Sequence, residues 1–209
     1  MKKISLTRIV AFLILSLSLS FLYACNTDDN EANRNKTNQI LTELDSASLL
    51  FMLEEEKLAR DTYTYLNSIW SLNQFANIKN SEQSHMDAIE NLLIQYDIDY
   101  TILPAGNFIN QDLQDFYDQF VVDGTVSQAN ALQIGATIED LDIVDLQEYI
   151  NATSNTDLIT VFSRLQCGSR NHLRSFVSAI VNNNNTYTPQ FLTTVEFNNI
   201  LQENHEQCN

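Results

Sequence analysis

The chain has 209 residues, with 27 aspartates and glutamates against 11 lysines and arginines, and a formal net charge of −16 at pH 7. Such an acidic chain is not expected to bind nucleic acid or anionic lipid headgroups through its charge, although it can attract cations. Only four glycines and two prolines interrupt it, and few segments alternate apolar with polar residues. The sequence therefore predicts an all-α protein.

Residues 1–25 are predicted to be a targeting segment outside the folded domain. A basic start, MKK, precedes an apolar run over residues 9–22, which is shorter than a typical membrane-spanning helix. The run ends in LYAC, which resembles the signal of bacterial lipoproteins, where the cysteine, here Cys25, is lipidated and becomes the new N-terminus. The resemblance implies export and a lipid anchor on the periplasmic face of a membrane or on the cell surface. An uncleaved anchor and an ordinary signal peptide are the alternatives.

Residues 26–39 are polar and lack an apolar period. They predict a disordered, solvated tether over residues 26–41. Residues 42–209 remain as one helical domain, which is long enough to bury a hydrophobic core.

Apolar residues at helical spacing predict four long helices and two short ones in this domain. The long helices are expected at 43–71, 74–96, 127–150 and 156–182. The short ones are expected at 111–122 and after the capping box that starts at Thr193. Caps are expected at Asn73, Ser127 and Asn155.

Loop lengths predict how these helices are arranged. Short loops make the first two and the last two long helices antiparallel hairpins. The long connection over residues 97–126, with Pro104 and Gly106, can cross the bundle. The prediction is a four-helix bundle with one long crossover connection that carries a short helix, plus a short C-terminal helix, which is the topology of ferritin-like folds.

Each long helix carries ionisable residues inside its apolar stripe. In chain order these are Glu56, Glu82 with His85, Glu139 with Asp142, and His172. A lone carboxylate in an apolar core costs several kcal/mol, so four of them in one bundle predict a bound cation. Four carboxylates and two imidazoles form the ligand set of a dinuclear site, and these donors suit iron or manganese.

The same segments resemble the ferritin-like superfamily and come close in pattern to rubrerythrins. EEEKLARDTY resembles a first-helix signature that makes Glu56 the ligand, and SEQSH resembles the second-helix Glu-x-x-His motif. The third helix of rubrerythrins has two carboxylates one turn apart, and the fourth has a histidine, as here at Glu139, Asp142 and His172. Together EEEKLARD, FANIKNSEQSHM, IGATIEDLDI and GSRNHLRSF resemble an uncharacterised domain-of-unknown-function branch over residues 42–201.

Ser169 departs from that pattern, because the fourth helix of the family normally carries a glutamate at this position. Three readings stay open: Asp142 compensates from the adjacent helix, the second metal is held weakly, or the protein binds one metal or none.

Other residues have simpler expectations. Arg60 and Tyr63 could orient ligands or serve packing and surface roles, whereas Glu54 and Glu55 are expected to be solvated. Cys167 and Cys208 could form a disulfide in an exported protein, but their separation in space cannot be deduced from the sequence.

Two functions are expected from the resemblance and the ligand set. The first is a redox metalloprotein that oxidises Fe(II) or reduces oxygen or peroxide, with an external electron donor because no CxxC pair is present. The second is a non-enzymatic lipoprotein that acts as a metal-binding or interaction module. The sequence defines neither the substrate nor the oligomeric state.

Overall fold

The computed structural model describes residues 41–208, which form six helices and no strand. The helices are α1 (Glu43–Trp70), α2 (Asn73–Gln95), α3 (Gln111–Gly124), α4 (Gln128–Ala152), α5 (Thr156–Asn182) and α6 (Thr194–Gln202). The all-α prediction is therefore confirmed for this part of the chain. The expected targeting segment, the expected lipidation site at Cys25 and nearly all of the expected tether lie outside the described residues. Within 41–208, no helix combines the length and the apolarity needed to cross a membrane.

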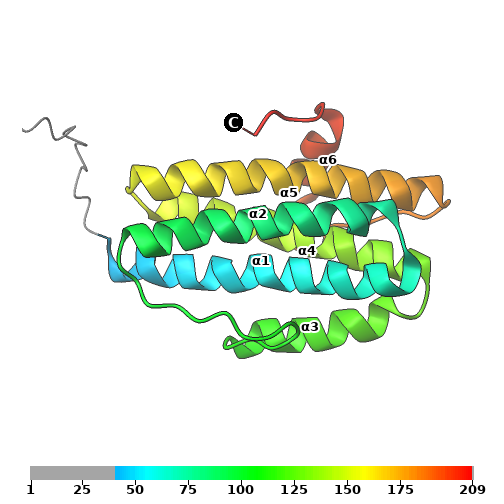
Figure 1. The fold of residues 1–209 in the computed structure, drawn as a ribbon. Coiled ribbons are helices and arrows are strands. Elements are labelled where there is room, and N and C mark those ends of the chain that lie inside the picture. The colour runs from blue at the N-terminus through cyan, green and yellow to red at the C-terminus, as the bar shows by residue number, and fades with distance from the viewer. Residues whose placement is uncertain (1–40, 209) are drawn as a thin grey trace, which may run out of the picture. The chain divides into compact units, whose positions relative to one another are not determined.

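The four long helices lie side by side in two hairpins (Figure 1). α1 packs against α2 and α4, and α5 packs against the same two helices. The connection from α2 returns along the bundle through α3 before α4 begins, so α2 and α4 run in the same direction (Figure 1). α3 packs against α1 and α4, and α6 packs against α5.

Side-chain caps account for most helix starts. Ser127, Asn155 and Thr193 accept backbone hydrogen bonds at the starts of α4, α5 and α6, as the sequence predicts. The predicted cap at Asn73 is wrong, because Leu72 is the N-cap of α2 and makes no side-chain cap bond. Ser71 ends α1 in the left-handed region, with φ of 52°. Ser71 and Leu72 alone thus form the turn between α1 and α2, and Asn73 is already the first residue of α2.

The long connection is fastened to one face of α1 by buried charged residues. Nζ of Lys57 donates to Asp61 Oδ2 at 2.7 Å and to the carbonyl of Asn107 at 3.0 Å. Glu54 accepts the backbone N–H groups of Ile109 and Asn110 at 2.7 and 2.8 Å. The expectation that Glu54 is solvated is therefore wrong. Its face of α1 is covered by the connection, whose backbone N–H groups its carboxylate satisfies.

Two hydrophobic clusters occupy the bundle interior. One includes Leu49, Met52, Met86, Ile89, Leu146 and Phe162. The other includes Leu58, Tyr63, Phe75, Ile78, Leu132 and Phe176. On each long helix the predicted ligands fall between residues of the first cluster and residues of the second. A polar layer therefore divides the apolar core near the middle of the bundle.

Candidate metal centre

The structure brings ligand atoms from all four long helices into this polar layer. Two groups have one ligand atom per residue within 4.8 Å of one another: Glu56, Glu82 and His85, and Glu82, Glu139 and His172. Five of the six residues predicted from the sequence are thus neighbours in space. All three glutamates of these groups are buried.

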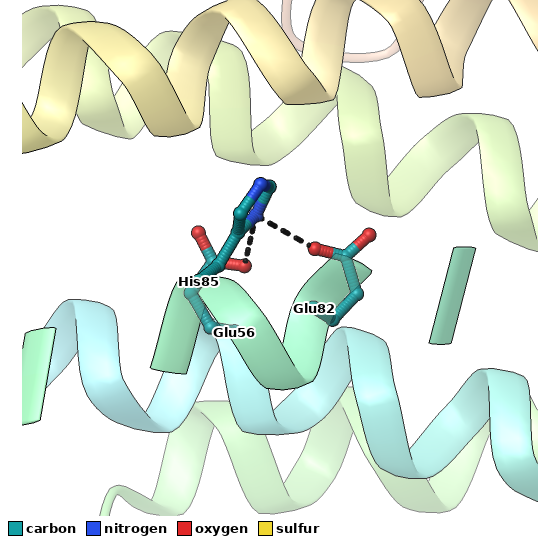
Figure 2. A group of neighbouring side chains, drawn as sticks. All are labelled: Glu56, Glu82 and His85. Atoms are coloured by element: carbon teal, nitrogen blue, oxygen red, sulfur yellow. Dashed lines mark hydrogen bonds and ion pairs between the residues drawn. The ribbon is translucent and has the colours of Figure 1, made fainter. Parts of the chain in front are cut away.

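In the first group the imidazole of His85 lies between two carboxylates. Nδ1 of His85 is 3.1 Å from Oε2 of Glu56 and 2.9 Å from Oε2 of Glu82, as the dashed lines in Figure 2 show. Glu56 reaches the group from α1, whereas the other two residues lie one turn apart on α2. Nδ1 is thus the ring nitrogen that faces the site.

The second group repeats this geometry with Glu82 as the common member. Nδ1 of His172 is 2.9 Å from Oε1 of Glu82 and 3.3 Å from Oε2 of Glu139. Glu82 therefore offers one carboxylate oxygen to each group. The two imidazole rings stack with their centroids 5.6 Å apart.

Asp142 lies beside both groups but belongs to neither. Its side chain is buried, and Oδ2 accepts a hydrogen bond from the hydroxyl of Ser169 on α5. The other oxygen, Oδ1, has no hydrogen-bond partner. Asp142 thus places a carboxylate next to Ser169, the α5 residue at which the sequence departs from the ferritin-like pattern that it resembles.

Of the two residues expected to orient ligands, Tyr63 contacts a candidate ligand and Arg60 does not. Tyr63 is fully buried and donates its hydroxyl proton to Oε1 of Glu139 at 2.6 Å. The guanidinium of Arg60 donates to Asp61 and Gln83. The geometry therefore gives Tyr63, and not Arg60, a direct contact with a candidate ligand.

Burial and mutual repulsion shift the protonation of these groups. Burial raises the pKa of Glu56 to about 7, although His85 opposes the shift. Burial and then the charge of Glu82 raise the pKa of Glu139 to about 7. Burial acts to lower the pKa of His172, but Glu82 and Glu139 outweigh it and raise that pKa to about 10. The metal-free site therefore retains protons that a cation would displace.

Glu82 is shifted in the opposite direction. Burial alone would raise its pKa, but the charges of His172 and His85 hold the pKa below its ordinary value. The shared carboxylate is thus ionised with an imidazolium at each oxygen.

A second buried carboxylate that the sequence pattern did not predict is Glu55, next to Glu54. Glu55 is 1 % exposed, and neither of its carboxylate oxygens accepts a hydrogen bond from an N–H or hydroxyl group. Its expected solvation is therefore wrong, because α4 packs on the side of α1 where Glu55 lies. The available signal was that Glu55 shares a helix face with the apolar residues Phe51 and Leu58.

The cysteines predicted as a possible pair are joined by a disulfide. Cys167 on α5 and Cys208 in the C-terminal segment have Cα atoms 5.6 Å apart. Glu206 lies close by and accepts hydrogen bonds from Arg170 and Arg174. The disulfide and these ion pairs hold the C-terminal segment against the outer face of α5, whose inner face contributes Ser169 and His172.

The donor set fits a pair of divalent cations. Oε1 of Glu56 and Oδ1 of Asp142 are buried without partners. Oε1 of Glu82 and Nδ1 of His172 lie 2.9 Å apart without the alignment of a hydrogen bond. Buried polar atoms are normally satisfied, and carboxylate and imidazole donors suit iron, manganese or zinc.

Fold and site together define a class: an all-α protein whose helices enclose a buried cluster of carboxylates and imidazoles. Residues 45–204 match the family described as "Uncharacterized protein domain (DUF2202)", and the chain belongs to this family. It is 43 % identical over 171 residues to the uncharacterized protein MJ0754 of Methanocaldococcus jannaschii, across 81 % of this chain and 92 % of that protein. The crystal structure of the hypothetical protein MJ0754 matches with a TM-score of 0.79 over 80 % of this chain and 97 % of the other.

Proposed function

We propose that the protein binds two divalent metal ions, iron first and manganese as the alternative, through Glu56, Glu82, His85, Glu139, Asp142 and His172. The observation that carries this proposal is the position of Glu82. One oxygen of this carboxylate lies 2.9 Å from His85 Nδ1, and the other lies 2.9 Å from His172 Nδ1. A carboxylate placed in this way can bridge two ions, each of which has its own histidine and its own further glutamate.

The charges of the ligand set support the same stoichiometry. Four buried carboxylates can contribute four negative charges, and two divalent ions contribute four positive ones. The assembled site would be neutral, which removes most of the cost of burying its charges.

The fold supports the assignment to a ferritin-like, rubrerythrin-like branch. Two helical hairpins joined by a crossover, with a Glu-x-x-His pair on the second long helix, match the arrangement that builds dinuclear carboxylate sites in such bundles. In place of the carboxylate that such bundles carry on the fourth long helix, the third long helix, α4, would supply Asp142. Ser169 of α5 positions Asp142 through a hydrogen bond.

The activity supported best is oxidation of Fe(II) or reduction of oxygen or peroxide. A bound pair of iron ions would supply the redox chemistry. The chain holds the ligands in fixed geometry between two apolar clusters that restrict water. Tyr63 holds Glu139 through the hydrogen bond from its hydroxyl. Electrons would come from an external donor, because the sequence has no CxxC pair for a rubredoxin-type iron site.

A non-enzymatic metal-binding or interaction module is the second candidate. Ser169 favours it, because a serine in place of the usual carboxylate removes one anionic ligand from α5. Turnover separates the two candidates, since an enzyme consumes oxidant over many cycles whereas a binding module saturates once.

The test is to load the protein with Fe(II) under anaerobic conditions and to measure bound iron per chain. We expect about two irons. The double variant Glu82→Ala/His85→Ala should lose most of the metal, whereas Asp87→Asn, at an exposed position of the same helix, should keep it. Oxygen and peroxide consumption by the loaded protein then tests turnover. Absence of bound iron, manganese and zinc in the parent protein would overturn the proposal.

We further propose that the protein is exported and attached to a bacterial membrane through a lipid on Cys25. The support is the order of a basic start, an apolar run and LYAC at the N-terminus of the sequence. Metabolic labelling with a radioactive fatty acid should mark the parent protein and not a Cys25→Ala variant.

A further inference from the structure

Four acidic residues follow one another at intervals of three along α4: Glu139, Asp142, Asp145 and Glu148. In an α-helix a step of three residues advances about 4.5 Å along the axis and turns the side chain back by about 60°. Such a row winds gradually from one face of a helix to the opposite face. Burial follows this course, because Glu139 and Asp142 are buried, Asp145 is half-buried and Glu148 is exposed.

Glu55 of α1 stands beside the middle of this row. Burial and then the nearby charges of Asp142 and Asp145 raise the pKa of the Glu55 carboxyl group, which also lies within hydrogen-bond reach of Asp145. Glu55 therefore lies between the innermost and the outer members of the row, at the contact between α1 and α4.

Other buried carboxylates of the same helices show that Glu55 is unusual. Glu54 accepts two backbone N–H groups. Asp140 is fully buried and accepts the hydroxyl of Tyr187 and the N–H of Leu192, both at 2.7 Å. Neither oxygen of Glu55 accepts a hydrogen bond from an N–H or hydroxyl group, and its one hydrogen-bond neighbour is the carboxyl group of Asp145. Glu55 thus fastens neither backbone nor loops, and its carboxyl group faces other carboxyl groups.

We propose that Asp145, Glu55 and Asp142 form a path by which divalent cations pass from the surface to the metal centre, with Glu148 at its outer end. The inference rests on the proposed dinuclear site and adds how that site is filled. Each carboxylate can bind a cation with oxygen ligands and transfer it to the next, as hard divalent ions require. The negative potential of the row also concentrates cations at its entrance.

The experiment compares the rate of metal uptake with the amount bound at equilibrium. Metal-free protein is mixed anaerobically with Fe(II), and free iron is quenched with a chromogenic chelator after set times. Glu55→Gln keeps the size of the side chain and removes its charge. We expect uptake to slow by roughly tenfold or more, with unchanged iron per chain at equilibrium. Asp145→Asn should show the same effect.

A matched control is Glu203→Gln, which removes one negative charge from an exposed residue that follows α6. Its uptake should equal that of the parent. Asp145 is half-buried, so the Asp145→Asn variant decides the question if Glu55→Gln does not fold, as judged by circular dichroism.

Three results would overturn the path. Unchanged uptake rates in both path variants, with normal iron in the parent, would reject the path but leave the dinuclear site standing. Loss of bound iron at equilibrium in Glu55→Gln would make Glu55 a ligand of the centre and not a transfer residue. Absence of iron in the parent would reject the dinuclear site and the path with it.

Discussion

Gly168 of α5 lies directly against the imidazole of His85 on α2. A Cβ atom placed on Gly168 would stand 2.7 Å from Nε2 and 2.8 Å from Cε1 of His85. The absence of a side chain at Gly168 thus leaves room for the ring, whose other nitrogen faces Glu56 and Glu82. A helical glycine costs about 1 kcal/mol relative to alanine, and here its position makes space for a candidate ligand.

Gly168→Ala should therefore damage one half of the metal centre. The new methyl group would displace the His85 ring, while His172 Cε1 at 3.9 Å is at ordinary contact distance. We expect bound iron to fall by about one ion per chain, and overpacking to cost about 1–3 kcal/mol of stability. Elemental analysis and urea unfolding measure these effects. Ser163→Ala, at an exposed position of the same helix, is the control, and full iron in Gly168→Ala would contradict the role of His85.

Glu82→Gln should have a larger effect, because Glu82 is the only carboxylate shared by the two candidate groups. The amide preserves size but removes the charge that would neutralise both ions. We expect bound iron to fall to well below one ion per chain. Loss of a group that only orients a ligand typically lowers metal affinity by about 10–100-fold, so loss of a shared ligand should lower it by at least as much. Anaerobic titration with Fe(II) measures it, with Asp87→Asn of the same helix as the control; retention of two ions would show that Glu82 is not a bridge.

Asp142→Asn tests whether this carboxylate replaces the one absent at Ser169. The amide oxygen can still accept the Ser169 hydroxyl, so the local packing should be kept. The loss of one negative charge leaves a two-ion site with excess positive charge in a buried layer. We expect the second ion to bind roughly tenfold or more weakly while the first is retained. Equal affinity for both ions in this variant and in the parent would remove Asp142 from the ligand set.

The sequence predicts the long helices well, because each one has a long apolar stripe and most have a strong cap. It also marks Glu56, Glu82 and His172, because an ionisable residue inside such a stripe must lie in the core. It fails for Glu54 and Glu55. The apolar pattern of one helix identifies only its most apolar face as buried. α1 is covered on several sides, by other helices and by the connection, so further faces are buried as well.

The sequence also does not reveal which atoms the buried side chains contact. Lys57 looks like a surface residue in the sequence, yet it is 1 % exposed and binds the carbonyl of Asn107, 50 residues away. The role of Gly168 depends on a ring from another helix. Such contacts follow from the packing of segments remote in sequence, and helical periodicity carries no information about them.

Reduction of the Cys167–Cys208 disulfide should destabilise the protein without emptying the metal centre. The bridge closes a loop over a sequence separation of 41 residues, for which loop-closure entropy predicts about 4 kcal/mol of stabilisation. Cys208→Ser should lower the urea midpoint accordingly while bound iron is kept, because Cys208 lies in the C-terminal segment and not in the polar layer. Reductant should shift the parent to the same midpoint and leave the variant unchanged. An equal midpoint for oxidised parent and variant would show that the disulfide adds no stability.

The metal-free protein should lose stability as the pH rises from about 5 to 10. The pKa of Glu56 is raised by burial from 4.5 to about 7, and Glu82 and Glu139 overcome burial to raise the pKa of His172 from 6.5 to about 10. In both cases the folded state binds the proton more tightly than the unfolded state. The stability that each proton gives the folded protein is therefore complete below the pKa of the group in the unfolded state. It disappears as the pH rises past the pKa of the group in the folded state.

Glu82 acts in the opposite sense, because its lowered pKa contributes stability that is lost only in acid. Maximal stability of the metal-free protein is thus expected near pH 5. Iron binding displaces the protons of Glu56 and His172, so the loaded protein should not show the decline. Urea unfolding at pH 5, 7 and 9 with and without metal measures this. Glu56→Gln should make the decline of the metal-free protein between pH 5 and 7 smaller, while Glu139, whose pKa is also raised to about 7, keeps part of it. A metal-free protein that gains stability over this range would show that the site does not retain its protons, and the electrostatic argument for two cations would lose its basis.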